Sequence, residues 1–161
     1  LCDTPGFMVG PDAEKTAQVR RVSRMMVNGS TLSVPFVLVV LRKAYGLGAM
    51  AMSGGNFQET TLTVAWPTGE FGAMGIEGAA RTGFKRQLDA IADPKAKQAQ
   101  FEAIVAMMYA HGKATNVASL LEIDNVIDPA DTRRWITTGL LAASRDTSRR
   151  TGRKRSHIEP W

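Results

Sequence analysis

A glycine-rich segment directly after an apolar run is the part of this sequence whose residues could do chemistry. Residues 35–41 read Pro-Phe-Val-Leu-Val-Val-Leu, which is typical of a strand buried on both faces. Gly46, Leu47 and Gly48 follow where the chain should turn from strand to helix. Backbone N–H groups at a helix start stabilise negative charge on a carbonyl oxygen or another anion. We therefore predict an oxyanion-stabilising turn, with tight strand–helix packing as the alternative reason for the glycines.

Residues 46–51 also match the dinucleotide-binding pattern Gly-x-Gly-x-x-Ala. A nucleotide-binding turn of that kind needs a full helix behind it and an acidic residue after the next strand. Here Gly54 and Gly55 stop the helix early, and Trp66-Pro67 stands where the acidic residue would be. The sequence therefore argues against nicotinamide binding.

Four other side chains could take part in chemistry, and we favour a structural explanation for each. Cys2, at a strand end, is most simply a small buried residue. His111, at the end of a predicted helix, is expected to interact with that helix end. Glu70 and Glu77 flank a second glycine turn at 71–75, where carboxylates serve helix starts. One cysteine and two histidines, widely spaced, predict no metal site.

Composition limits the class of protein. With 161 residues, 44% of them hydrophobic and 22% charged, the chain is typical of one soluble globular domain without a membrane span. A single cysteine excludes an internal disulfide and fits the cytoplasm or an organelle matrix. Most of the formal net charge of +5 lies in a basic tail, 145–161, after a near-neutral domain at 1–144. The tail has no aromatic residue before Trp161, which argues against nucleic-acid binding.

Several flanking elements must position the glycine turn. A helix over 13–27, capped by Asp12, is expected before it, and β-branched residues predict a strand over 60–66 after it. The remaining elements are expected at 76–82, 84–91, 94–109, 116–121 and 129–143 as helices and at 125–127 as a strand. Two strand–turn–helix units in succession predict a layered α/β domain.

Several runs, in order along the chain, together resemble a known family. They are Asp3-Thr4-Pro5-Gly6-Phe7-Met8-Val9-Gly10, Arg42-Lys43-Ala44-Tyr45-Gly46, Trp66-Pro67-Thr68-Gly69-Glu70, Met74-Gly75-Ile76-Glu77-Gly78-Ala79 and Ile127-Asp128-Pro129-Ala130-Asp131-Thr132-Arg133. This combination resembles the carboxyltransferase (β) subunits of biotin-dependent acyl-CoA carboxylases, of the acetyl-/propionyl-CoA carboxylase type. The likeness covers nearly the whole chain.

The resemblance implies a crotonase-like (ClpP/crotonase superfamily) α/β fold, a β-β-α spiral domain. The chain looks like most of the C-terminal half of such a subunit, so the domain at 1–144 is expected to be incomplete at its N-terminus. An opening at Leu1 without an initiator methionine agrees with a piece of a longer protein. Because the N-terminal half holds most of the CoA in that family, we expect the fragment to be inactive alone.

The reaction that the resemblance implies is transfer of a carboxyl group from carboxybiotin to the α-carbon of an acyl-CoA, such as acetyl- or propionyl-CoA. By motif matching, the backbone donors of Gly46, Leu47 and Gly48 would form an oxyanion hole for the enolate charge on the biotin ureido oxygen. Biotin itself would act as the base, so neither a catalytic side chain nor a metal ion is needed. The implied partners are a biotin carboxylase or biotin carboxyl carrier subunit, the chain's own N-terminal half and a second carboxyltransferase subunit in a homo-oligomer.

Further site residues follow from the same match. Gly6, Phe7, Tyr45 and Ala49 fall at biotin-binding positions. Met50 falls where family members influence acyl-chain preference, and propionyl-preferring members read Gly-Gly-Ala-Tyr-Asp where this chain has Gly-Leu-Gly-Ala-Met. A flexible thioether favours an apolar chain but leaves its length open.

Two alternatives stay open. A biotin-dependent acyl-CoA decarboxylase subunit would share these motifs and run the transfer in the other direction. A non-catalytic module with a basic tail that binds nucleic acid or an acidic partner is the alternative from another class of protein.

Overall fold

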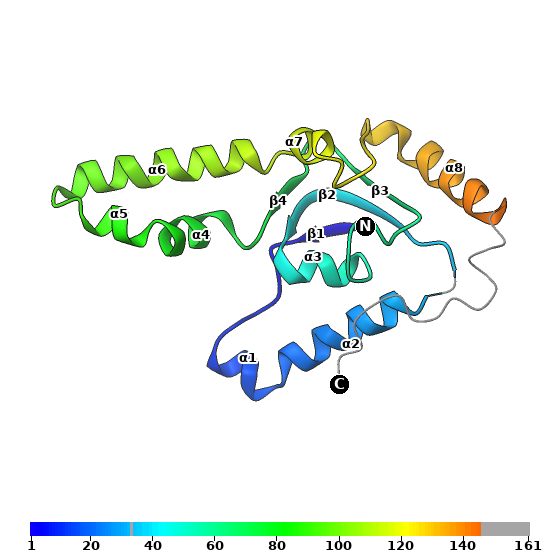
Figure 1. Ribbon diagram of the computed structural model, residues 1–161, viewed down its shortest axis with the longest axis horizontal. Helices are drawn as coiled ribbons and strands as arrows, with labels where there is room; N and C mark the ends of the chain where they lie inside the picture. The colour runs from blue at the N-terminus through cyan, green and yellow to red at the C-terminus, as the bar shows by residue number, and fades with distance from the viewer. Residues whose placement is uncertain (33, 146–161) are drawn as a thin grey trace.

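The computed structural model describes residues 1–32 and 34–145 (Figure 1). Within them, five strands form one sheet in the order β1-β2-β3-β5, and β4 also pairs with β2. The strands, all paired in parallel, are β1 (Cys2–Thr4), β2 (Val37–Tyr45), β3 (Leu62–Ala65), β4 (Glu70–Gly72) and β5 (Asn125–Val126). The predicted α/β class is therefore confirmed.

Strand β2 is the centre of the sheet and runs four residues beyond the expected apolar segment, to Tyr45. Its first half pairs with β3, from Val37 with Leu62 onward. Its second half pairs with β4, from Lys43 with Glu70 to Tyr45 with Gly72. Sequence patterning predicted a turn over 71–75 and missed β4, because the pairing that creates this short strand comes from a distant segment.

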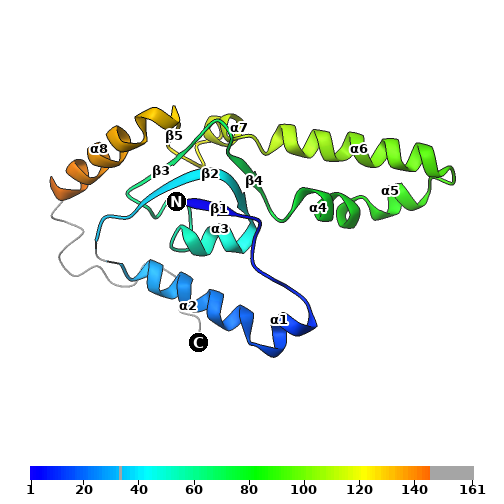
Figure 2. The same cartoon turned by 180° about the vertical axis from the view of Figure 1, so that it is seen from behind.

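The two faces of β2 bury different layers of the core. Leu38 and Val40 point to one face, where they pack with Ala49 of helix α3 (Gly46–Met52). Val39 points to the other, where it packs with Ile127 and with Trp135 of helix α8 (Thr132–Arg145). Consecutive buried residues of this kind mark a strand covered on both sides, as predicted. Figures 1 and 2 show α3 and α8 flanking the sheet.

Two helices, α1 (Pro11–Lys15) and α2 (Gln18–Ser30), replace the single expected helix over 13–27. The prediction of Asp12 as N-cap is wrong, because Gly10 is the N-cap and Pro11 takes the first helical position, which suits its fixed φ. Asp12 lies inside the first turn. The chain breaks at Ala17, whose φ of 54° is left-handed.

A helical arm, residues 76–111, extends away from the sheet (Figure 2). It consists of α4 (Ile76–Gly83), α5 (Lys85–Asp89) and α6 (Pro94–His111). The helix predicted over 94–109 is confirmed, and its Phe101, Ile104, Val105 and Met108 form an apolar face that packs with Ala80 and Leu88. Hydrogen bonds from Lys85 and Lys97, at 2.8 and 2.9 Å, hold the pKa of Asp89 at about 2 at the tip of this arm.

The remaining elements lie close to the predicted ranges. They are α7 (Ala114–Ser119), the 3₁₀ turn η1 (Pro129–Asp131) and α8. Apart from Arg145, which ends α8, the basic tail lies outside the described residues, so the boundary at 144 stays a prediction. None of the helices within the described residues is both long and apolar enough to cross a membrane.

Candidate functional site

Helix α3 follows β2 directly, where the sequence predicted a turn from strand to helix. Tyr45 is the N-cap residue in an extended conformation, and no side chain of the described residues caps this end. The first helical N–H groups have no acceptor within a helix, so those of Leu47 and Gly48 are directed to the space beyond the helix start. Leu47 is 54% exposed, whereas Gly48 is buried. Gly54 and Gly55, with φ of +81° and +117°, end the segment as expected.

Glycine at two positions of this turn is required by close packing. A Cβ on Gly48 would lie 2.7 Å from the carbonyl carbon of Gly6 and 2.8 Å from its Cα. Gly46 has a φ of +56°, and a Cβ there would lie 2.5 Å from the carbonyl oxygen of Ala73. The packing explanation for these glycines is therefore confirmed, and the donor role of the turn stays a prediction.

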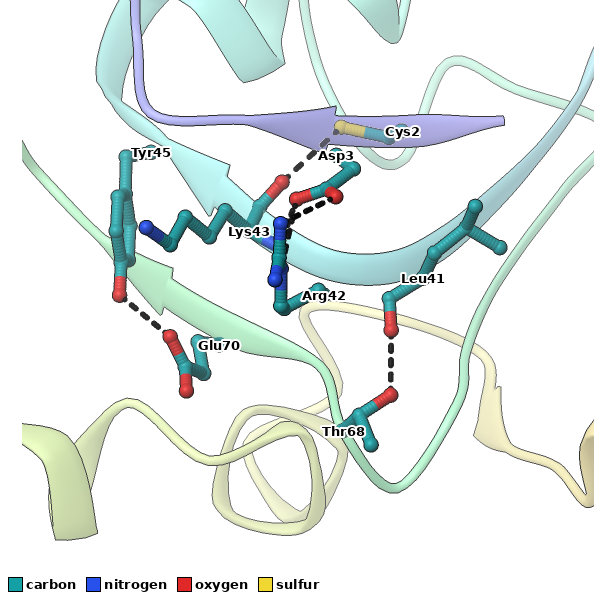
Figure 3. A network of polar contacts seen from close by, with 8 residues as sticks. All are labelled: Cys2, Asp3, Leu41, Arg42, Lys43, Tyr45, Thr68 and Glu70. Atoms are coloured by element: carbon teal, nitrogen blue, oxygen red, sulfur yellow. Dashed lines mark hydrogen bonds and ion pairs between the residues drawn. The ribbon is translucent and has the colours of Figure 1, made fainter.

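The loop after β1 lies against this turn. Gly6 has a φ of +112°, its N–H donates to Thr4 Oγ1 at 3.3 Å, and that hydroxyl donates to the Gly6 carbonyl at 3.0 Å. Upstream, Asp3 fastens β1 to β2 by accepting from Arg42 Nη2 at 3.0 Å and from the Lys43 N–H at 3.1 Å (Figure 3). The two segments that sequence matching placed at one pocket are thus neighbours.

Asp3 should make this attachment sensitive to acid. The Lys43 N–H and then the Arg42 side chain lower the pKa of Asp3 from its ordinary value of 3.8. A carboxylate whose pKa is depressed by folding contributes stability that is present above its unfolded pKa and lost as the pH falls through its folded pKa. We expect Asp3→Asn to reduce the urea midpoint at about pH 6, and the difference from wild type to shrink by about pH 3. A difference that stays constant between these pH values would contradict this account.

Tyr45 is buried, with 2% of its surface exposed. Its hydroxyl donates to Glu70 Oε2 at 2.9 Å (Figure 3). Burial, and next this hydrogen bond, raise the pKa of Tyr45. Ala49 is also fully buried, so at these two of the four predicted biotin-binding positions only the backbone could meet a ligand. Gly6 and Phe7 are partly exposed.

An apolar cavity of about 500 Å³ opens beside the turn, between α3 and the helical arm. Its lining includes Gly46 and Met50 of α3 and, across from them, Ile76, Met108 and His111. The structure therefore places the predicted specificity residue, Met50, on the wall of a space that suits an apolar group.

The other candidate side chains have structural partners. Cys2 is fully buried, and burial raises the pKa of its thiol. His111 Nδ1 lies 3.3 Å from the Met107 carbonyl at the end of α6, and Glu77 lies in the first turn of α4, both as expected. Glu70 belongs to β4 rather than to a helix start, a role that sequence reasoning missed. The described residues contain no cluster of three or more potential metal ligands.

Comparison with known protein families shows which family this chain belongs to. Residues 1–158 match the family model of the carboxyl transferase domain, and the chain belongs to that family. The methylmalonyl-CoA carboxyltransferase 12S subunit of Propionibacterium freudenreichii subsp. shermanii is 39% identical over 140 residues, which cover 87% of this chain and 26% of that protein. The chain thus spans about a quarter of the length of this curated relative.

Solved structures agree with this assignment. Transcarboxylase 12S, with methylmalonyl-CoA and methylmalonic acid bound, matches with a TM-score of 0.82 at 34% identity over 98% of this chain and 29% of its own. A single-chain, multi-domain long-chain acyl-CoA carboxylase matches with a TM-score of 0.73 at 55% identity, over 85% of this chain and 13% of its own. The expected crotonase-like fold is thereby confirmed.

Proposed function

We propose that this chain is part of a biotin-dependent acyl-CoA carboxyltransferase, which moves a carboxyl group from biotin on a separate carrier to the α-carbon of an acyl-CoA. The observation that carries the proposal is the uncapped start of α3 in contact with the loop at Gly6. Family membership and the names of the matched relatives support it.

The residues present fit the ureido group of biotin. The N–H groups of Leu47 and Gly48 need an acceptor from outside the helix, and a ureido oxygen is a suitable acceptor. When bound, biotin would supply the transferable carboxyl group and a base for the α-proton. The two N–H groups would stabilise negative charge on the oxygen, and the loop at Gly6 and Phe7 would bound the same opening. No side chain of this chain has to act as acid or base.

The acyl group of the substrate is proposed to lie towards the apolar cavity. Met50 is 38% exposed and lines that cavity, so it would contact an acyl chain rather than a polar group. The thioether can adapt to chains of different length. The matched relatives are named for acyl groups of different length, methylmalonyl-CoA in one and long-chain acyl-CoA in another, and the candidate substrates extend over this range.

The proposed partners are a biotin carboxylase or biotin carboxyl carrier protein, an N-terminal half of the carboxyltransferase and a second carboxyltransferase subunit. One matched relative is described as a hexamer at the core of a multienzyme complex. The proposed compartment is the cytoplasm or an organelle matrix, because the single cysteine fits a reducing setting.

The direct test is reverse carboxyl transfer by the gene product that contains these residues. We expect transfer from malonyl-CoA or methylmalonyl-CoA to biotin or biocytin, followed as the appearance of the decarboxylated acyl-CoA that depends on the acceptor. Comparing the two donors, and donors with longer acyl chains, would define the substrate. A folded gene product that transfers from none of them would overturn the proposed function.

A further inference from the structure

The side chain of Tyr45, the N-cap residue of α3, makes a hydrogen bond whose acceptor is on another strand. Tyr45 ends β2 and caps α3, so the position of its backbone sets where the first N–H groups of the helix point. Its ring is buried and a Cβ on Gly72 would lie 3.4 Å from Tyr45 Cδ1. The hydroxyl at the end of this ring donates to Glu70 at 2.9 Å.

The strand register explains why Glu70 can reach this hydroxyl. Tyr45 is paired with Gly72 and Lys43 with Glu70 in the parallel β2–β4 ladder. Residues two apart on a strand point to the same face, so Tyr45 and Glu70 lie diagonally on one face of the sheet. Figure 3 shows their side chains directed at one another.

Glu70 itself is anchored on both sides. The N–H of Phe71 donates to the Gly112 carbonyl at 2.7 Å, and the N–H of Ala114 donates to the Gly69 carbonyl at 2.9 Å. A Cβ on Gly112 would lie 2.3 Å from the Phe71 carbonyl oxygen, so the two backbones are in direct contact. The acceptor of the Tyr45 hydroxyl is therefore on a segment that cannot readily follow a displaced tyrosine.

We propose that Glu70 is a positioning residue that acts through Tyr45 to fix the backbone donors at the start of α3. The inference rests on the proposed function for its effect on the reaction. It goes beyond that function because it assigns a role to Glu70, a carboxylate that does not line the cavity. The family resemblance did not place Glu70 among the site residues. The hydrogen bond to β4 holds the phenol of Tyr45 in place, and the phenol in turn holds the backbone at the start of α3. This role of Glu70 requires an oxygen that accepts the hydrogen bond, not a negative charge.

The test compares Glu70→Leu, Glu70→Gln and Tyr45→Phe in the gene product that contains this chain. Glu70→Leu and Tyr45→Phe should lower kcat about tenfold with the KM for acyl-CoA unchanged, since the donors act in the transition state. Glu70→Gln should keep most of the activity, because its amide oxygen still accepts from the phenol. A matched control is Thr132→Val, which removes the acceptor of another aromatic side chain, Trp66 Nε1, at 3.0 Å, outside the contact between β2 and β4.

Amide hydrogen exchange separates this proposal from the proposed function. We expect faster exchange at 46–49 in Glu70→Leu, with Glu70→Gln and Thr132→Val close to wild type, whether or not the protein transfers carboxyl groups. Unchanged exchange and kcat in Glu70→Leu, equal losses in Thr132→Val, or a Glu70→Gln as defective as Glu70→Leu would each overturn the positioning role. If the wild-type protein transfers no carboxyl group but the variants show the expected differences in exchange, only the proposed function is overturned.

Discussion

Gly48→Ala is expected to lower the rate of carboxyl transfer by about 100-fold, the effect of losing one donor of an oxyanion hole. The new Cβ would lie 2.7 Å from the Gly6 carbonyl carbon and 2.8 Å from its Cα. Both neighbours are backbone atoms, so α3 and the loop at Gly6 must separate. A displacement of about 1 Å at the N–H groups suffices to misdirect them from a reacting oxygen. The substitution keeps the Gly48 N–H, so the loss would come from its position.

A control substitution distinguishes this effect from a general response to alanine in a helix. Gly78 lies inside α4, and a Cβ there would have no atom within 4 Å. We expect Gly78→Ala to transfer carboxyl groups at the wild-type rate. The measurement is steady-state transfer from malonyl- or methylmalonyl-CoA to biocytin, with circular dichroism to compare the folds. A folded Gly48→Ala protein within about twofold of wild type would exclude the backbone-donor mechanism.

The sequence predicted those helices and strands whose bounds are set by residues close to them in the chain. The bounds of α3 follow from glycines at both ends of a short apolar segment, and the arm follows from the helical spacing of Phe101, Ile104, Val105 and Met108. Strand β2 was recognised from its buried residues but not in its full length. Its last residues, which include Arg42 and Lys43, do not read as apolar, and their pairing with β1 and β4 decides their conformation.

In the candidate site, too, the sequence predicted features that depend on neighbouring residues and missed contacts between distant segments. Spacing alone could identify Gly46 and Gly48 as special backbone positions, because glycine has few other uses at a strand-to-helix turn. It could not show that Gly6 lies against Gly48, or that the Tyr45 hydroxyl is bound by Glu70, since both contacts join distant segments. Motif matching predicted Tyr45 at the ligand, and this stays a prediction; it could not show that the buried ring reaches Glu70 of β4.

Helix α2 depends on a second glycine contact, and Gly29→Ala is expected to destabilise its attachment. None of the residues of α2 is buried, yet α2 approaches α3 so closely that a Cβ on Gly29 would lie 2.4 Å from Gly54 Cα. Gly54 has a φ of +81° and ends the α3 segment, so it cannot move without disturbing that segment. Overpacking of this kind costs about 1–3 kcal/mol, and contact with backbone favours the upper part of that range.

The loss should appear as a lower midpoint of urea unfolding and as faster amide exchange along 18–30, since α2 would separate from α3 before the sheet opens. Gly83→Ala is the matched control, because Gly83 also lies at the end of a helix and a Cβ there would meet no atom within 4 Å. Alanine has the higher helix propensity, so this control should be as stable as wild type or slightly more so. Equal midpoints for Gly29→Ala and Gly83→Ala would mean that α2 is held by its partly buried side chains and not by the glycine contact. Helix α3 carries the proposed donors. A confirmed loss of stability in Gly29→Ala would therefore mean that the packing of α2 against α3 also helps to set the position of these donors.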